Sequence, residues 1–110
     1  MFDKRFDFYK LVDKVPVKCT IEEYSGNERI ICRDSFDDVT VSTVFLPFDH
    51  SFDDDSEPIL FETMVFEGPH DGYIQRYHTY DEAVEGHKEV CYFINKVSID
   101  RSNKLDDLGI

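Results

Sequence analysis

The sequence predicts an α+β fold: an antiparallel sheet of four to five strands with one main C-terminal helix packed on one face. Between residues 28 and 78, short apolar or alternating segments are separated by turn residues, as in antiparallel strands. After residue 79 the apolar residues change to helical spacing. The 110 residues suit a single domain with one core. We divide the chain into a hairpin with a short helix (1–27), the sheet (28–78), the helix (80–97) and a polar tail (99–110).

The N-terminal part predicts a β-hairpin followed by one helical turn. Residues 8–12 and 15–18 are extended candidates separated by a two-residue turn. Because proline cannot donate a backbone hydrogen bond, Pro16 places the second strand at an edge. The segment Thr20–Glu23 has the residue types and spacing of a capping box, which predicts a short helix over 20–25.

Four segments predict the strands of the main sheet. The first is Glu28–Arg33, and the second is Val39–Leu46, whose far end is apolar on both faces. The third, Pro58–Phe66, is almost continuously apolar and is therefore expected at the centre of the sheet. A turn rich in glycine and proline separates it from the last strand, Tyr73–His78.

The helix begins at a second capping box, Thr79–Glu82, whose acidic residues suit the positive end of the helix dipole. Gly86 costs this helix roughly 1 kcal/mol relative to alanine. We attribute that cost to a close approach between the helix and a strand. One apolar stripe is expected to cover the sheet, formed by Ala83, Val84, His87, Val90, Cys91, Ile94 and Val97.

The composition is strongly acidic, with 24 Asp and Glu against 12 Lys and Arg and a formal net charge of -12. We do not expect direct binding to nucleic acid or to an anionic membrane, because both depend on cationic contacts. No apolar run approaches the roughly 20 residues that a membrane span needs, and the first residues lack the apolar region of a signal peptide. Three widely spaced cysteines, an odd number, indicate reduced thiols in a cytoplasmic protein.

No motif for a nucleotide, a nucleophilic serine or a zinc protease is found, so we expect neither catalytic residues nor a cofactor. His87 and Cys91 lie four residues apart and would share one face of the helix. This spacing allows two interpretations, a pair of zinc ligands or a thiol nucleophile with its base. Both lie on the apolar stripe without recognisable further ligands, so core packing is favoured and no metal is expected. Glu62 is a charge within an apolar strand, and an ion pair with Arg76 on the next strand is favoured over a catalytic role.

The acidic segment from 49 to 57 is the strongest candidate for partner binding. It fails the pattern of a calcium-binding EF-hand, because Pro58 stands where the loop needs glycine. A solvated loop and a loose Ca²⁺ or Mg²⁺ site are the alternatives. Asp34, Asp37 and Asp38 are expected at the same acidic edge. The candidate partner-binding residues are Asp49, His50, Asp53, Asp54, Asp55 and Glu57.

Five segments in order within residues 38–91 resemble a family of small proteins from phages, prophages and mobile elements. They are Asp38–Leu46, Phe48–His50, Ile59–Gly68, Arg76–Thr79 and Glu82–His87. The family carries a VSTV-hydrophobic-L…DH segment, an FETMVFGG segment and an RY-x-T…A-x-x-GH helix start. The resemblance attaches no catalytic activity to these motifs, so no catalytic residue carries over.

This chain departs from that family at two places. Pro47-Phe48 replaces the small Gly-Leu step that usually precedes the Asp-His pair, and acidic residues over 53–57 replace a loop that is usually rich in glycine. The acidic loop is therefore this protein's own elaboration.

Together the charge and the resemblance predict a phage-encoded acidic binding protein that acts in the host cytoplasm. It would inhibit a host nucleic-acid-handling defence complex stoichiometrically, as an anti-CRISPR does, by occupying a basic surface of a protein or ribonucleoprotein. One alternative is a phage accessory structural or regulatory protein that acts by self-association as a homodimer. A less favoured alternative is a small metal-dependent or hydrolytic enzyme that uses Glu62, His50 or His87.

Overall fold

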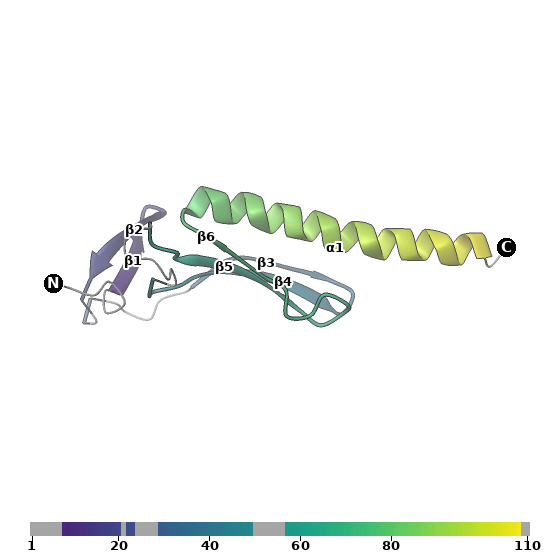
Figure 1. Cartoon of the computed structure of the whole chain (residues 1–110), viewed down its shortest axis with the longest axis horizontal. Helices are drawn as coiled ribbons and strands as arrows, with labels where there is room; N and C mark the ends of the chain where they lie inside the picture. Colours follow the sequence, from purple (N-terminus) through teal and green to yellow (C-terminus); the bar gives the residue numbers. More distant parts are fainter. Residues whose placement is uncertain (1–7, 21, 24–28, 50–56, 109–110) are drawn as a thin grey trace.

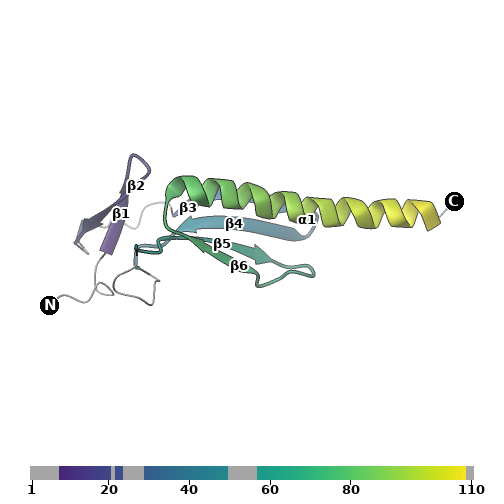
Figure 2. The ribbon, with the colours of Figure 1, turned by 45° about the horizontal axis from the view of Figure 1, so that its top comes forward.

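The structure is a computed structural model that describes residues 8–20, 22–23, 29–49 and 57–108, with side chains described as far as Lys96. Its centre is an antiparallel sheet of four strands in the order β3-β4-β5-β6. A single long helix, α1, crosses one face of this sheet (Figures 1 and 2). The α+β class and the placement of the main helix are confirmed. The elements are β3 (Ile30–Phe36), β4 (Val39–Phe45), β5 (Phe61–Phe66), β6 (Ile74–Tyr77) and α1 (Tyr80–Leu108).

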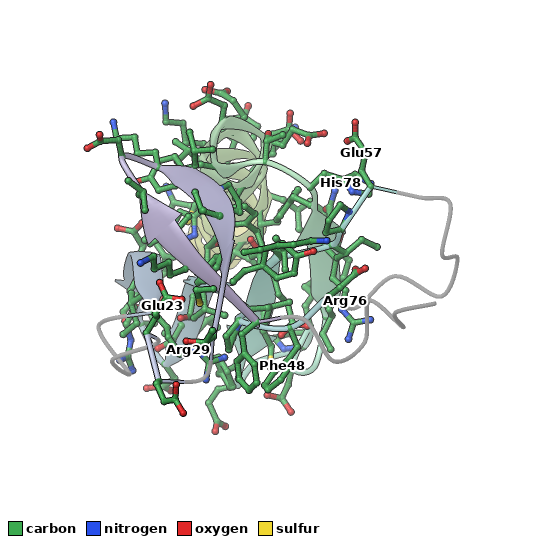
Figure 3. The ribbon with its side chains drawn as sticks, turned by 90° about the vertical axis from the view of Figure 1, so that its left-hand side faces the viewer. Glu23, Arg29, Phe48, Glu57, Arg76 and His78 are labelled. Atoms are coloured by element: carbon green, nitrogen blue, oxygen red, sulfur yellow. The ribbon has the colours of Figure 1, made fainter. Side chains whose placement is uncertain are left out.

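A hairpin of β1 (Phe8–Val12) and β2 (Val15–Cys19) forms a separate two-stranded sheet at the end of the main sheet from which α1 starts (Figures 1 and 2). Its two turn residues both have positive φ, which matches the twist of a two-residue hairpin. Tyr9 is buried in the main core, and the Phe8 ring lies 4.4 Å from that of Phe48. Phe48 lies beside this hairpin, as Figure 3 shows. The predicted hairpin is confirmed, and Pro16 lies in an edge strand.

The core lies between the sheet and α1, because alternate residues of the two central strands point toward the helix. Val41, Thr43 and Phe45 of β4 and their register partners on β5 are buried. The predicted helical stripe is confirmed for the described side chains, since α1 buries Ala83, His87, Val90 and Ile94. Val84 and Cys91 are half-buried, and the side chain of Val97 lies outside the described residues. Near the start of α1 the core is aromatic, whereas further along it consists of valines and an isoleucine.

Two glycines permit close approaches that hold these layers together. A Cβ on Gly86 would enter the ring of Tyr77, so the predicted close approach of α1 to a strand is confirmed. A Cβ on Gly68, which has a φ of 77°, would lie 2.6 Å from Val39. The turns after β3 and after β5 therefore lie side by side at one end of the sheet.

Several predicted boundaries are wrong. The helix was expected to end at 97 with a polar tail over 99–110, but α1 continues to Leu108. No glycine or proline interrupts 98–108, so backbone hydrogen bonding continues although the sequence is polar. The helix is about 43 Å long against about 23 Å for a seven-residue strand, so it extends beyond the sheet (Figure 1). The first strand of the main sheet was expected over 28–33, but β3 runs from Ile30 to Phe36.

The capping box at the N-terminal turn is present, because the backbone N–H and side chain of Thr20 and of Glu23 bond reciprocally at 3.1 and 3.2 Å. The helix expected over 20–25 falls partly outside the described residues. Within the part of the chain that the structure describes, no helix combines the length and the apolar character that crossing a membrane requires.

Candidate functional site

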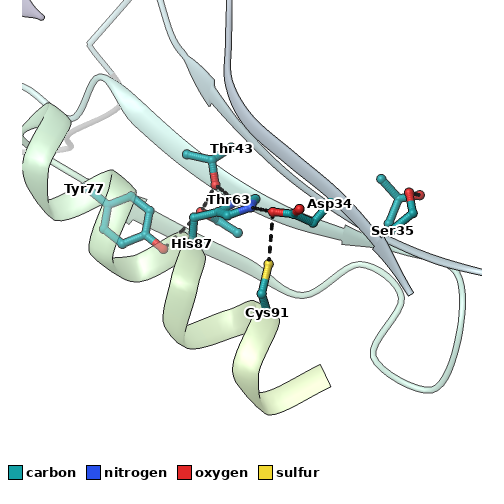
Figure 4. Close-up of polar contacts among 8 residues, drawn as sticks. Asp34, Ser35, Thr43, Thr63, Tyr77, His87 and Cys91 are labelled. Atoms are coloured by element: carbon teal, nitrogen blue, oxygen red, sulfur yellow. Dashed lines mark hydrogen bonds and ion pairs between the residues drawn. The ribbon is translucent and has the colours of Figure 1, made fainter. Parts of the chain in front are cut away.

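A continuous chain of hydrogen-bonded side chains runs between the sheet and α1 (Figure 4). Tyr77 Oη donates to Thr63 Oγ1 over 3.1 Å, and Thr63 Oγ1 lies 2.5 Å from Thr43 Oγ1. Thr43 Oγ1 lies 2.7 Å from His87 Nδ1, and the other ring nitrogen, Nε2, lies 2.7 Å from Asp34 Oδ2. The chain thus leads from a buried phenol to a carboxylate at the surface.

Strand register and helical spacing bring these residues together. Thr43 and Thr63 are direct partners in the β4–β5 pairing, so both hydroxyls point toward α1. Asp34 is paired with Val41 and therefore faces the same side from β3. Both threonines and His87 are buried, whereas the side chain of Asp34 is 56% exposed. Asp34 was expected at the acidic edge, past the end of a strand predicted over 28–33, and lies instead within β3, which continues to Phe36.

One assignment of protons satisfies the whole chain. An ionised carboxylate only accepts, so His87 Nε2–H donates to Asp34, and Nδ1 of a neutral ring then accepts from Thr43. Thr63 donates to Thr43 and accepts the hydrogen bond from the Tyr77 hydroxyl. Each hydroxyl then donates once within the chain, and among the described side chains no buried polar atom lacks a partner.

Cys91 adds a second donor to the same carboxylate oxygen. Its Sγ lies 3.7 Å from Asp34 Oδ2, one helical turn beyond His87 (Figure 4). Burial, followed by the negative charge of Asp34, raises the pKa of the Cys91 thiol to about 12. Burial also raises the pKa of Cys32, and Asp34 adds to that effect. Cys91 is thus a protonated thiol at neutral pH.

This arrangement matches neither a hydroxyl-His-Asp triad nor the Cys-His pair considered from the sequence. In a Ser-His-Asp triad the hydroxyl faces substrate and the carboxylate is buried. Here the order is reversed, because Thr43 is fully buried and Asp34 is exposed. A Cys-His pair needs the imidazole to accept the thiol proton. Both ring nitrogens of His87 are instead engaged by Thr43 and Asp34.

Asp34, His87 and Cys91 form a group of potential metal ligands. One donor atom from each lies within 4.8 Å of the other two. The sequence indicated the pair on the helix but not Asp34, which precedes His87 by 53 residues. Strand alternation could have indicated Asp34, since Cys32, Asp34 and Phe36 occupy every second position of one strand and therefore share a face. A cavity of about 320 Å³ beside the group is lined by Phe36, Tyr92 and Asn95, among others.

The structure describes only part of the predicted partner-binding loop. Asp49 is buried, and its carboxylate accepts the Ile59 N–H over 2.9 Å, so this side chain bonds to the protein's own backbone and is not displayed for a partner. Glu57 is exposed (Figure 3). His50 and Asp53–Asp55 lie outside the described residues. Their role in binding stays a prediction.

The sheet face away from α1 carries the ion pair predicted from the sequence. Arg76 Nε donates to Glu62 Oε2 over 3.0 Å, and the two residues are register partners on β6 and β5. Glu62 is therefore a paired carboxylate of the open face, as favoured.

Acidic side chains are exposed at two further places. Glu82, Glu85 and Glu89 follow one another at helical spacing on the outer side of α1, and we call them the α1 acidic ridge. Four more acids are exposed at the paired turns after β3 and β5, namely Asp37, Asp38, Glu67 and Asp71.

Comparison with protein-family models, with curated proteins and with solved structures found no match to this chain.

Proposed function

We propose that this protein is a stoichiometric inhibitor that occupies the basic nucleic-acid-binding surface of a host defence complex. The observation that carries the proposal is the α1 acidic ridge on a rigid helix packed against the sheet. The phage setting and the comparison with anti-CRISPR proteins rest on the motif resemblance described above.

The ridge has a charge density suited to this role. Glu82 to Glu89 span about 10 Å of helix axis and present three carboxylates. One strand of duplex DNA carries a phosphate about every 3.4 Å, or about three over the same length. Lys88 contacts Glu85 at 3.4 Å, but this pair is exposed and leaves the ridge net negative.

The paired turns extend the acidic surface toward the far end of the sheet. Gly68 packs on Val39, which holds the turn after β5 against the turn after β3. The four exposed acids of these turns thus lie at one end of the sheet. With a net charge of -12, the protein attracts basic surfaces over a distance of about one Debye length.

A competition assay tests the proposal. Labelled DNA or RNA is bound to purified host CRISPR effectors and other nucleic-acid-handling defence complexes, and its displacement by the protein is followed by fluorescence anisotropy. Two variants with the same change in net charge are compared: E85K/E89K on the ridge and D53K/D55K in the acidic loop. Loss of displacement in the ridge variant assigns binding to α1, and loss in the loop variant assigns it to the loop. Displacement that both variants retain, or none by the wild-type protein, would contradict the proposal.

Salt separates this mode of binding from an apolar one. Charge-mediated displacement weakens as ionic strength rises. A groove of about 340 Å³ between α1 and the sheet, lined by Tyr73, Phe93 and Ile94 among others, is the apolar alternative. Inhibition that persists at high salt would favour this groove over the ridge.

A second candidate function is self-association through the open face of the sheet. Ile30, Phe66 and Ile74 are each more than 40% exposed, which is typical of an apolar surface that a partner covers. Sedimentation of the wild-type protein and of I74K over a range of concentrations tests it. A mass that rises with concentration in the wild type alone would support a homodimer as the functional unit.

A further inference from the structure

We propose that Asp34, His87 and Cys91 form a zinc site with three protein ligands, which joins β3 to α1 and leaves a fourth coordination position open. This inference is independent of the proposed inhibitory function, since it concerns different residues. The ligand atoms are Asp34 Oδ2, His87 Nε2 and Cys91 Sγ (Figure 4).

The distances fit tetrahedral zinc after small movements. Bond lengths of about 2.0 to 2.3 Å place tetrahedral ligands about 3.3 to 3.8 Å apart. Cys91 Sγ lies 3.7 Å from Asp34 Oδ2, within this range. His87 Nε2 lies closer, at 2.7 Å from the same oxygen, and none of the three separations exceeds 4.8 Å. Because the Asp34 side chain is more than half exposed, it has room to adjust.

The surroundings of His87 support the site independently of the ligand distances. Metal-bound histidines almost always direct their second ring nitrogen to a hydrogen-bonding group, which fixes the ring. Here His87 Nδ1 lies 2.7 Å from Thr43 Oγ1, and Thr43 is itself held by Thr63. The ring is buried, so its orientation is fixed before any metal arrives.

The donor set selects the metal. A thiolate, an imidazole and one carboxylate suit Zn²⁺, whereas Mg²⁺ and Ca²⁺ require oxygen ligands. Three protein ligands with an open position are also the arrangement found in catalytic zinc sites. The cavity of about 320 Å³ beside the ligands, which Lys88 and Tyr92 help to line, gives the open position access to water.

Each zinc ion that binds releases one proton from the protein. The Cys91 S–H bond breaks, the sulfur forms a bond to Zn²⁺, and the thiol proton passes to solvent. His87 frees Nε2 for the metal by shifting to the tautomer with hydrogen on Nδ1. That hydrogen then donates to Thr43, and the direction of the hydroxyl chain reverses. Thr43 donates to Thr63, Thr63 donates to Tyr77 Oη, and the Tyr77 hydroxyl proton turns away from Thr63.

The test uses the full chain with Co²⁺ as a spectroscopic probe and Zn²⁺ as competitor. We expect a thiolate-to-cobalt charge-transfer band and the visible bands of tetrahedral Co²⁺ at a 1:1 ratio, both abolished by Zn²⁺ and unaffected by Mg²⁺ or Ca²⁺. Thermal unfolding should shift upward as Zn²⁺ is added, because the metal binds the folded state.

Variants identify the ligands. C91S and D34N are chosen because both side chains lie at the edge of the core, whereas loss of buried His87 endangers folding. Each should weaken Zn²⁺ binding by more than about 100-fold, above the range for losing an outer-shell partner. C19S in the β1–β2 hairpin is the control and should bind as the wild type does. The site is refuted if the wild-type protein gives no tetrahedral Co²⁺ spectrum, or if C91S and D34N both bind Zn²⁺ with wild-type affinity while circular dichroism shows them folded.

Discussion

The two faces of the four-stranded sheet each place an acidic side chain against a nitrogen partner, and they differ in what happens when the partner is lost. On the face covered by α1, His87 Nε2 lies 2.7 Å from Asp34 Oδ2. The hydrogen-bond chain continues inward from His87 Nδ1 to two buried threonines. On the open face, Arg76 meets Glu62 at 3.0 Å. The distances are similar, but the nitrogen partners differ: the Arg76 side chain is 38% exposed, so water can replace it, whereas the His87 side chain is 4% exposed and has buried Thr43 behind it.

This difference in access to water sets the energetic consequence. An exposed ion pair contributes about 0–1 kcal/mol, because water and salt screen it. A buried polar group that loses its partner costs about 1–3 kcal/mol, since nothing replaces the bond. The covered face should therefore dominate stability, because loss of His87 leaves the buried Thr43 without its partner. Each prediction below tests this ranking.

The largest effect is expected for His87→Ala. The substitution leaves a cavity beneath α1 and removes the partner of buried Thr43, so the free energy of unfolding should fall by about 3–4 kcal/mol. Urea denaturation followed by circular dichroism measures it. His78→Ala is the control: that ring is half-buried and bonds the Pro58 carbonyl at 3.0 Å, so the loss should be smaller. Equal losses in both variants would contradict the ranking.

Gly86→Ala should be destabilising even though alanine is the better helix former. The added Cβ meets the ring of Tyr77, which is held in place by its bond to Thr63. Overpacking costs about 1–3 kcal/mol, whereas the higher helix propensity of alanine stabilises α1 by about 1 kcal/mol. We therefore expect the free energy of unfolding to fall by up to about 2 kcal/mol. In a Tyr77→Leu background, which removes the ring, the same substitution should become neutral or stabilising. Destabilisation of the same size in both backgrounds would show that the ring is not the cause.

Tyr77→Phe should cost about 1–2 kcal/mol at neutral pH, because the buried Thr63 hydroxyl loses its donor. Burial raises the pKa of Tyr77 above its usual 10.0, while the bond to Thr63 opposes the shift. The folded state therefore keeps the phenolic proton at a pH where the unfolded state releases it. This contribution to stability is complete below the unfolded pKa and is lost as pH rises through the folded pKa. The wild-type free energy of unfolding should thus fall more steeply than that of Tyr77→Phe above about pH 10. Parallel curves would contradict the assignment.

The elements that could be predicted from the sequence are those whose signals are local. Alternation and turn residues placed the hairpin and the four main strands, and the capping box at Thr79 and Glu82 is present with reciprocal bonds at 3.1 Å. The pairing of Glu62 with Arg76 followed from strands that are neighbours in sequence. The end of α1 could not be predicted, because its polar last turns contain no residue that stops a helix.

The candidate site shows where local signals end. His87 and Cys91 shared a helical face and were visible as a pair. Asp34 joins them only because β3 continues past Arg33, which turns the carboxylate toward α1. The bonds between the two threonines and His87 depend on the β4–β5 register and on the rotation of α1, neither of which the sequence specifies alone.

The smallest effect is expected on the open face. A double-mutant cycle with Glu62→Gln, Arg76→Gln and the double variant should give a coupling free energy of about 0.2–1 kcal/mol, because the Arg76 side chain is 38% exposed and water screens the pair from that side. The coupling should decrease further when the urea titrations are repeated at about 1 M salt, where the Debye length is about 3 Å. The single losses should also stay below that of Tyr77→Phe. A coupling above about 2 kcal/mol that persists at high salt would mean that water does not reach this pair. The open face would then be covered in solution, which is the outcome that a homodimer through this face requires.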